Sequence, residues 1–111
     1  MCLFCEIAKG TIPSKIAFQD ETVVAFHDIA PQAPVHVLII PRKHIESVHA
    51  LTMEENDLLC HMFEVARKLA AELGVADSGY RLITNIGKDA GQSVAHLHLH
   101  LIGGKTLNWN N

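Results

Sequence analysis

The chain has 111 residues, of which 49% are hydrophobic and 19% charged, and its formal net charge is −3. This length and composition predict one folded domain over residues 1–111 and exclude a disordered chain. The acidic balance argues against a nucleic-acid binder, which would carry a basic surface. No apolar run is long enough to cross a membrane, and the N-terminal residues are too few and too polar for a signal peptide. We therefore expect a cytoplasmic protein that engages neither membrane nor nucleic acid.

The first 41 residues predict three strands. Residues 15–20 and 22–27 flank an Asp-Glu turn, which is typical of a hairpin. Pro31 and Pro34 make residues 29–34 a rigid loop. Residues 35–40 are nearly all apolar and rich in β-branched side chains, so they predict a central strand that stops at Pro41.

One long helix is predicted next. Thr52 and Glu55 have the spacing of a capping box at a helix start. Apolar residues then recur at helical spacing, at Leu58, Met62, Val65, Ala66, Leu69 and Leu73. Gly74 is a suitable residue to end the helix. Cys60, within this segment, is expected to be a small buried hydrophobic residue.

The second half of the chain predicts two further strands, at residues 80–85 and 95–102, joined by a loop that contains glycines. Five strands with one long helix predict an α+β fold. Its sheet is expected to be mostly antiparallel and covered by the helix on one face.

The last of these strands alternates histidine with leucine. Because side chains alternate faces along a strand, the leucines are expected in the core, and the histidines would share the other face about 7 Å apart. The residues concerned are His96, His98 and His100, with Leu97, Leu99 and Leu101. Three side chains that titrate near neutrality favour metal binding or catalysis over a plain solvated face. The residues alone leave both functions open.

The loop just upstream, residues 87–93, reads Gly-Lys-Asp-Ala-Gly-Gln-Ser. It lacks the Gly-Lys-Ser/Thr ending of a Walker loop. Glycines and a hydroxyl can nevertheless direct N–H and O–H donors at a phosphate. Beside three histidines, this loop indicates phosphoryl or nucleotidyl transfer.

Residues 91–104, Gly-Gln-Ser-Val-Ala-His-Leu-His-Leu-His-Leu-Ile-Gly-Gly, resemble the signature of the histidine triad (HIT) superfamily. The resemblance extends through residues 26–34, His36, residues 40–45, residues 79–82 and Asn85. The Gly-Gly pair and the Asp-Ile-Ala-Pro-Gln-Ala-Pro loop are similar to the Hint branch, which comprises purine nucleoside phosphoramidases. The dinucleotide-hydrolase, uridylyltransferase and DNA-repair branches fit less well.

The resemblance implies a hydrolase that cleaves the P–N bond of purine nucleoside 5′-phosphoramidates, with aminoacyl adenylates as related substrates. His98 would attack the α-phosphorus and form a nucleotidyl-histidine, while His100 would contact the phosphate oxygens. Ser93 would pass a proton to the leaving amine, with His36 as a relay. A nucleotide-binding regulatory module and a dinucleotide polyphosphate hydrolase are the alternatives.

The resemblance also implies a nucleotide site. Asp28 would accept hydrogen bonds from the ribose hydroxyls, and Asn85, Gly91 and Gln92 would surround the phosphate together with Ser93. The base would lie in a slot formed by Phe4, Ile7, Phe26 and Ile29. For these four residues ordinary core packing is the alternative, because apolar residues usually pack in the core.

Cys2 and Cys5 have the spacing of half a zinc knuckle. In zinc-containing members of the family the site is completed by two histidines, which here are His44 and His96. The resemblance therefore implies a structural Zn²⁺ site, no organic cofactor and a homodimer whose two five-stranded sheets join into one of ten strands. Trp109 would reach toward the partner's active site.

Overall fold

A computed structural model describes residues 1–108, so the expectation for Trp109 lies outside the described residues. The elements are α1 (Leu3–Lys9), β1 (Ile16–Gln19), β2 (Val23–His27), β3 (Val35–Pro41), η1 (Val48–Ala50), η2 (Met53–Glu55), α2 (Asn56–Glu72), β4 (Tyr80–Ile83), η3 (Lys88–Ala90) and β5 (Leu99–Gly103). Within the described residues, no helix combines the length and apolarity that a membrane span needs.

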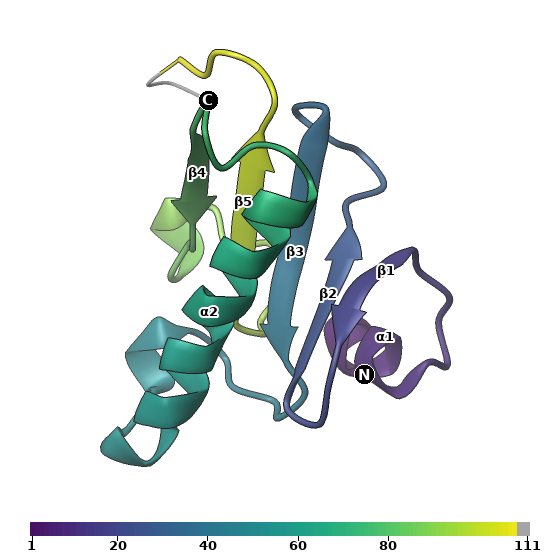
Figure 1. The fold of residues 1–111 in the computed structure, drawn as a ribbon. Helices are drawn as coiled ribbons and strands as arrows, with labels where there is room; N and C mark the ends of the chain where they lie inside the picture. The colour runs from purple at the N-terminus through teal and green to yellow at the C-terminus, as the bar shows by residue number, and fades with distance from the viewer. Residues whose placement is uncertain (109–111) are drawn as a thin grey trace.

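The five strands form one sheet in the order β1-β2-β3-β5-β4, and every neighbouring pair is antiparallel (Figure 1). The predicted α+β fold with one long helix is confirmed. The last strand of the chain, β5, lies between β3 and β4. This topology brings the histidine-rich end of the sequence beside the central apolar strand.

The two faces of the sheet carry separate cores. On one face α2 packs against Val37, Ile39, Leu99 and Leu101, which alternate with the residues of the other face. On the opposite face α1 packs against Val24, Phe26, Leu38 and Ile40. The side chains of His36 and His100 follow the alternation onto the α1 face.

The long helix starts as predicted. The Thr52 hydroxyl accepts a hydrogen bond from the Glu54 N–H, and the Glu55 carboxylate accepts one from the Thr52 N–H. The first turn is the 3₁₀ turn η2, and α2 ends at Glu72, just before Gly74 at φ 77°. The prediction for Cys60 is wrong, because its side chain is exposed. It lies about 200° around the helix from the buried Met62.

The helix α1 is absent from the sequence-based prediction. The thiol of Cys2 caps it by accepting a hydrogen bond from the Cys5 N–H at 3.4 Å, and Gly10 ends it with φ 84°. Phe4 and Ile7 on its inner side are buried against the sheet. The Cys-x-x-Cys spacing therefore spans the first turn of a helix, which fixes both thiols on one end of it.

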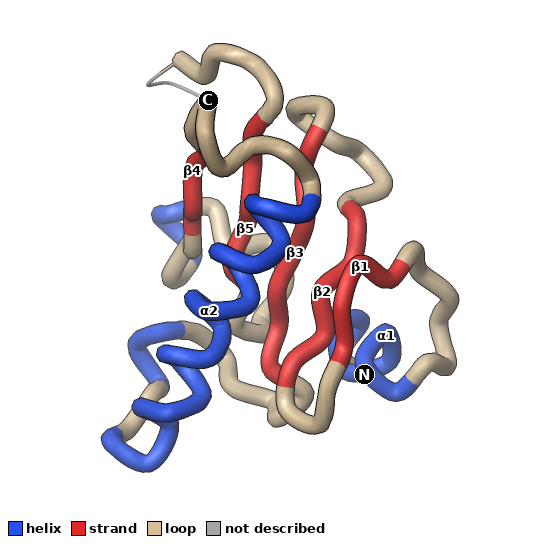
Figure 2. Tube along the Cα trace, viewed as in Figure 1, coloured by secondary structure: helices blue, strands red, loops and turns tan. Residues whose placement is uncertain are grey.

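The strand predicted at residues 95–102 is wrong at its start. Strand β5 begins at Leu99, and residues 92–98 run as a loop (Figure 2). The alternation still holds in this loop: Leu97 packs in the core beneath α2, whereas the rings of His96 and His98 both contact Phe4 on the other face. Strand β4 likewise ends at Ile83, two residues before the predicted end.

Candidate functional site

Four buried or half-buried histidines gather on the sheet face that carries α1. They are His36 on β3, His96 and His98 in the loop before β5, and His100 on β5. His36 pairs with Ile102 and His100 pairs with Leu38, which makes the two histidines diagonal neighbours across the strands. His36 is 3% exposed and His98 is 5% exposed, so both rings are held in fixed surroundings.

The ring of His98 is oriented by the backbone. Its Nδ1 lies 2.7 Å from the carbonyl oxygen of His96. A carbonyl only accepts, so Nδ1 carries the proton and Nε2 of a neutral ring keeps its lone pair. The ring of Phe4 packs edge-on against it, with centroids 5.0 Å apart. The arrangement orients the Nε2 lone pair of the neutral ring, which is what nucleophilic attack requires.

Two cavities meet at His98. The first, of about 320 Å³, is largely apolar and is lined by Phe4, Ile7, Phe26, Asp28, Ile29, His98, His100 and Ser93, among others. The second, of about 290 Å³, is more polar and is lined by Gln32, Ile83, Asn85, Gly91, Ser93, His98, His100 and Ile102. Ser93, His98 and His100 line both cavities. The arrangement suits a molecule whose reacting atom lies at the histidines, with one part in each cavity.

His36, His100 and Asp28 form a contiguous polar cluster. Nε2 of His36 lies 3.0 Å from Nδ1 of His100 and 3.4 Å from Oδ2 of Asp28. Burial lowers the pKa of His36, although Asp28 opposes this shift. Burial, together with His98 and His36, lowers the pKa of His100 to about 4. Both rings are therefore neutral at neutral pH.

The loop between β4 and β5 is held by its own amide side chains. Nε2 of Gln92 donates to the carbonyls of Glu46 and Val94, and its Oε1 accepts from the Gly87 N–H. Asn85 donates to the Ala90 carbonyl. Both amide donors of Gln92 are thus used within the chain, and its side chain lines neither cavity. Its contact with a phosphate stays a prediction of the resemblance.

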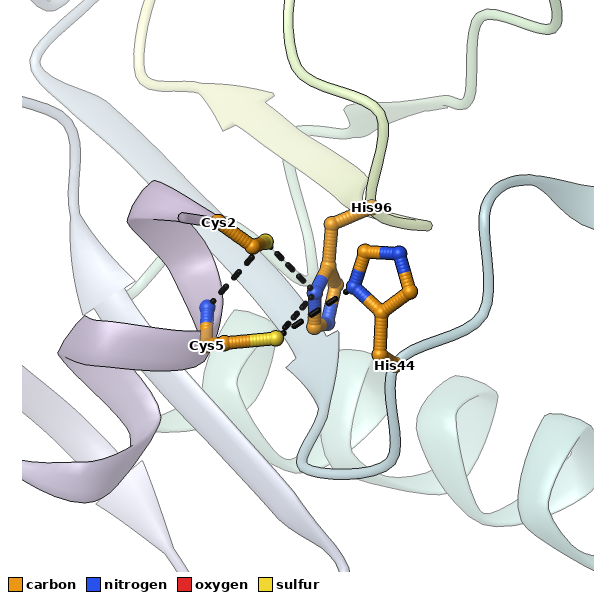
Figure 3. Close-up of side chains that lie close together, drawn as sticks. All are labelled: Cys2, Cys5, His44 and His96. Atoms are coloured by element: carbon orange, nitrogen blue, oxygen red, sulfur yellow. Dashed lines mark hydrogen bonds between the residues drawn. The ribbon is translucent and has the colours of Figure 1, made fainter.

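A second cluster is formed by Cys2, Cys5, His44 and His96, whose ligand-type atoms all lie within 4.8 Å of one another. The two thiols come from the start of α1, His44 from the loop after β3 and His96 from the loop before β5 (Figure 3). Nε2 of His96 donates to the Pro41 carbonyl at 2.8 Å, which leaves the lone pair of Nδ1 facing the thiols.

The dimensions of this cluster fit a tetrahedral zinc ion. The thiols of Cys2 and Cys5 lie 3.3 and 3.5 Å from Nδ1 of His96, and that of Cys5 lies 3.3 Å from Nδ1 of His44. Tetrahedral bonds of zinc to sulfur and nitrogen place the two ligand atoms about 3.5 Å apart. The hydrogen bond from His96 to Pro41 supplies the outer partner that zinc-binding histidines usually have.

The sequence-based prediction missed several residues of the site. The backbone N–H of Gln32 donates to Nδ1 of His36 at 3.1 Å. Leu3, Ile12 and Val94 also line the larger cavity. A backbone donor leaves no signal in residue type, although the two prolines of its loop indicate a fixed conformation.

The chain matches the HIT domain model over residues 9–107. It is 47% identical to the purine nucleoside phosphoramidase of Escherichia coli K12, in an alignment that covers 95% of this chain and 88% of that protein. It is also 44% identical to an uncharacterized HIT-like protein of Synechocystis, with coverage of 96% and 93%.

Solved structures show the same fold. A HIT family hydrolase from Legionella pneumophila superposes with a TM-score of 0.96 at 46% identity, covering 98% of this chain and 97% of its own. One from Clostridium thermocellum gives a TM-score of 0.93 at 50% identity, with coverage of 96% and 93%. With the three histidines, the sheet order and this degree of identity together, the chain belongs to the HIT domain family.

Proposed function

We propose that this protein is a purine nucleoside phosphoramidase that works through a nucleotidyl-histidine at His98. The observation that carries the proposal is the hydrogen bond from Nδ1 of His98 to the His96 carbonyl, which leaves Nε2 as a nucleophile between two cavities. The identity to the Escherichia coli phosphoramidase supports the substrate class.

The reaction has two balanced steps. Nε2 of His98 forms a bond to the α-phosphorus, and the P–N bond breaks as the leaving nitrogen gains a proton. Water then attacks phosphorus and gives up a proton, which replaces the one donated in the first step. The phosphorus–histidine bond breaks, its electron pair returns to Nε2, and the nucleoside 5′-monophosphate leaves. Ser93 lines both cavities beside His98, so its hydroxyl can donate to the leaving nitrogen, which would otherwise depart as a poor amide anion.

The larger cavity is the nucleoside side of the site. Its apolar walls, which include Phe4, Ile7 and Phe26, fit a purine ring. Asp28 lines the same cavity, and its Oδ1 accepts a hydrogen bond from the Ala30 N–H at 2.8 Å. The other oxygen remains able to accept from a ribose hydroxyl.

The smaller cavity is the leaving-group side. Its described lining contains neither lysine nor arginine. A dinucleotide substrate would place further phosphates there, and those charges call for cationic partners. This lining therefore favours an amine leaving group over a polyphosphate.

We also propose that Cys2, Cys5, His44 and His96 hold a structural Zn²⁺ ion, since the four atoms have the identity and spacing that such a site needs. Two thiolates and two imidazoles fill all four positions, so the ion would join α1 to the loops after β3 and before β5. It would take no part in the reaction.

A homodimer completes the proposal. Strand β4 is an edge of the sheet, and beside it lies an apolar hollow of about 200 Å³ lined by Val48, Leu59, Phe63 and Thr84, among others. Phe63 is 40% exposed. Pairing of β4 with the same strand of a second copy would cover this surface and extend the sheet to ten strands. Native mass spectrometry tests the dimer and the zinc together.

The direct test of function is turnover of adenosine 5′-phosphoramidate, with intact mass measured on quenched samples. We expect product and a transient nucleotidyl adduct with the unmodified protein, and neither with His98→Ala. His49→Ala is the matched control, because His49 is exposed on η1 and lines neither cavity. Full turnover by His98→Ala would reject the mechanism. Binding without turnover by the unmodified protein would favour the regulatory module.

A further inference from the structure

We propose that the backbone N–H of Gln32 sets the proton positions of His36 and, through it, of His100, so that His100 presents a permanent neutral Nε2–H donor. His36 is then a positioning residue that acts through His100. That this donor meets a phosphate rests on the proposed function. The proton positions themselves do not.

The first step is the contact between the loop and His36. The Gln32 N–H donates to Nδ1 of His36 at 3.1 Å, so Nδ1 carries no proton. A neutral imidazole has one N–H, which must therefore be on Nε2. His36 is 3% exposed and lines neither cavity. In place of the relay from His36 to Ser93, we infer that His36 acts on the site through its contact with His100.

The second step passes this choice to the next ring. Nε2–H of His36 lies 3.0 Å from Nδ1 of His100, and two N–H groups cannot face each other at that distance. Nδ1 of His100 must be bare, and its proton lies on Nε2. Asp28 Oδ2, at 3.4 Å from Nε2 of His36, is the longer and weaker acceptor for the same proton.

Charge supports the same arrangement. The groups that face His100 are His98, His36 and Asp28. Burial and the two histidines lower the pKa of His100 and Asp28 raises it, with a net value of about 4. Burial also lowers the pKa of His36. His36 and His100 therefore stay uncharged near pH 7, and neither must gain a proton before a phosphate is bound. The Nε2–H donor of His100 is in place before the reaction, as charge stabilisation in a transition state requires.

The loop that supplies the N–H is built for a fixed conformation. Gln32 lies between Pro31 and Pro34, whose rings restrict the backbone. Asp28 accepts from the Ala30 N–H, and its own N–H donates to the His36 carbonyl at 2.9 Å. The loop is therefore hydrogen-bonded to both the backbone and the ring of His36 on β3.

The same argument weighs against a metal here. Ligand-type atoms of Asp28, His36 and His100 lie within 4.8 Å of one another, as a metal site would require. A metal on Nε2 of neutral His36 would move its proton to Nδ1, where it would meet the Gln32 N–H. The proposal therefore treats this cluster as a hydrogen-bond chain and assigns the zinc to Cys2, Cys5, His44 and His96.

Two amide variants separate the steps. The amide of His36→Gln can place an N–H near the position of Nε2, where it faces His100. The shorter amide of His36→Asn reaches only the position of Nδ1, where it can accept from the Gln32 N–H. We expect His36→Gln to retain a kcat at least about tenfold above that of His36→Asn, with similar KM values, because one oriented donor is at stake. Melting temperatures are measured alongside. Equal kcat losses in the two variants would show a merely structural role and overturn the proposal.

The proton positions are read without substrate, from two-bond ¹H–¹⁵N spectra of protein labelled in its histidines. We expect N–H on Nε2 in both His36 and His100. The pKa of His100 is about 4 in the unmodified protein, and we expect it to be higher in His36→Asn, because the ring that lowers it is removed. A proton on Nδ1 of His100, or a second zinc ion that shifts both rings, would overturn the proposal. Because no turnover is involved, failure here is distinct from failure of the proposed function.

Discussion

His96 and His98 stand two residues apart, yet the backbone prepares them for opposite tasks. Nε2–H of His96 donates to the Pro41 carbonyl and leaves Nδ1 facing the thiols. Nδ1–H of His98 donates to the carbonyl of His96 and leaves Nε2 at the cavities. Both residues are buried histidines in one loop. The difference shows that the carbonyl within reach of a ring decides which nitrogen is available, and hence whether the ring can serve as ligand or nucleophile.

The strongest way to break this comparison is to truncate each ring in turn. We expect His98→Ala to lower kcat by at least about 10³-fold, because the nucleophile is lost. His96→Ala keeps its backbone carbonyl, so His98 remains oriented and turnover persists at temperatures where the variant is folded. Steady-state kinetics with a melting curve for each variant checks this. Similar kcat losses in the two folded variants would contradict the division of tasks.

Zinc removal tests the proposed role of His96 as a metal ligand. Cys5→Ser should release the ion and lower the free energy of unfolding by at least about 2 kcal/mol, or roughly 10 °C in Tm. Metal content and a melting curve measure the effect, and Cys60→Ser is the control, since Cys60 is exposed on α2. Zinc-free protein with an unchanged Tm would reject the zinc proposal.

The fold was predictable because its determinants are periodic. A nearly all-apolar, β-branched run predicted the central strand at residues 35–40, and the capping box placed the start of the long helix at Thr52. The helix α1 was missed because its seven residues are short for a periodicity argument, and its cap is a cysteine, which is not a usual capping residue. Cys60 was misplaced because small apolar character does not show which side of a helix a residue occupies.

The candidate site was predictable in its residue types but not in its proton positions. The sequence predicts that His98 and His100 share one face of the sheet, and the structure adds His36 to that face. The partners that orient His36 and His98 are the backbone groups of Gln32 and His96. Such groups occur at every residue and carry no sequence signal. Gln92 illustrates the converse, because a plausible phosphate donor is used in holding its own loop.

A smaller effect on kinetics is expected from a change at Asp28, which lines the larger cavity where we place the nucleoside. Asp28→Asn keeps the shape but replaces a charged acceptor, so we expect KM for the adenosine phosphoramidate to rise about tenfold. The same change should have little effect on a substrate that lacks both ribose hydroxyls. An equal rise of KM for the two substrates would show that Asp28 does not bind the ribose.

The smallest effect contrasts the buried site histidines with one on the surface. Hydrogen bonds to Glu64 and Asp20 raise the pKa of His61, in spite of partial burial. A raised pKa contributes stability that is present below the ordinary value of 6.5 and is lost as pH rises through the folded value. We expect His61→Gln to lose less than about 1 kcal/mol at pH 5.5 and almost nothing at pH 8.5. Denaturant unfolding at both pH values checks the sign, with His49→Gln as control.

The central claim is that neighbouring rings carry their protons on opposite nitrogens. Two-bond ¹H–¹⁵N spectra of the zinc-loaded, histidine-labelled protein test it directly, with His96→Ala and His98→Ala for assignment. The account predicts N–H on Nδ1 of His98 and on Nε2 of His96. A proton on Nε2 of His98 would remove the proposed nucleophile, and the same proton position in both rings would contradict the account.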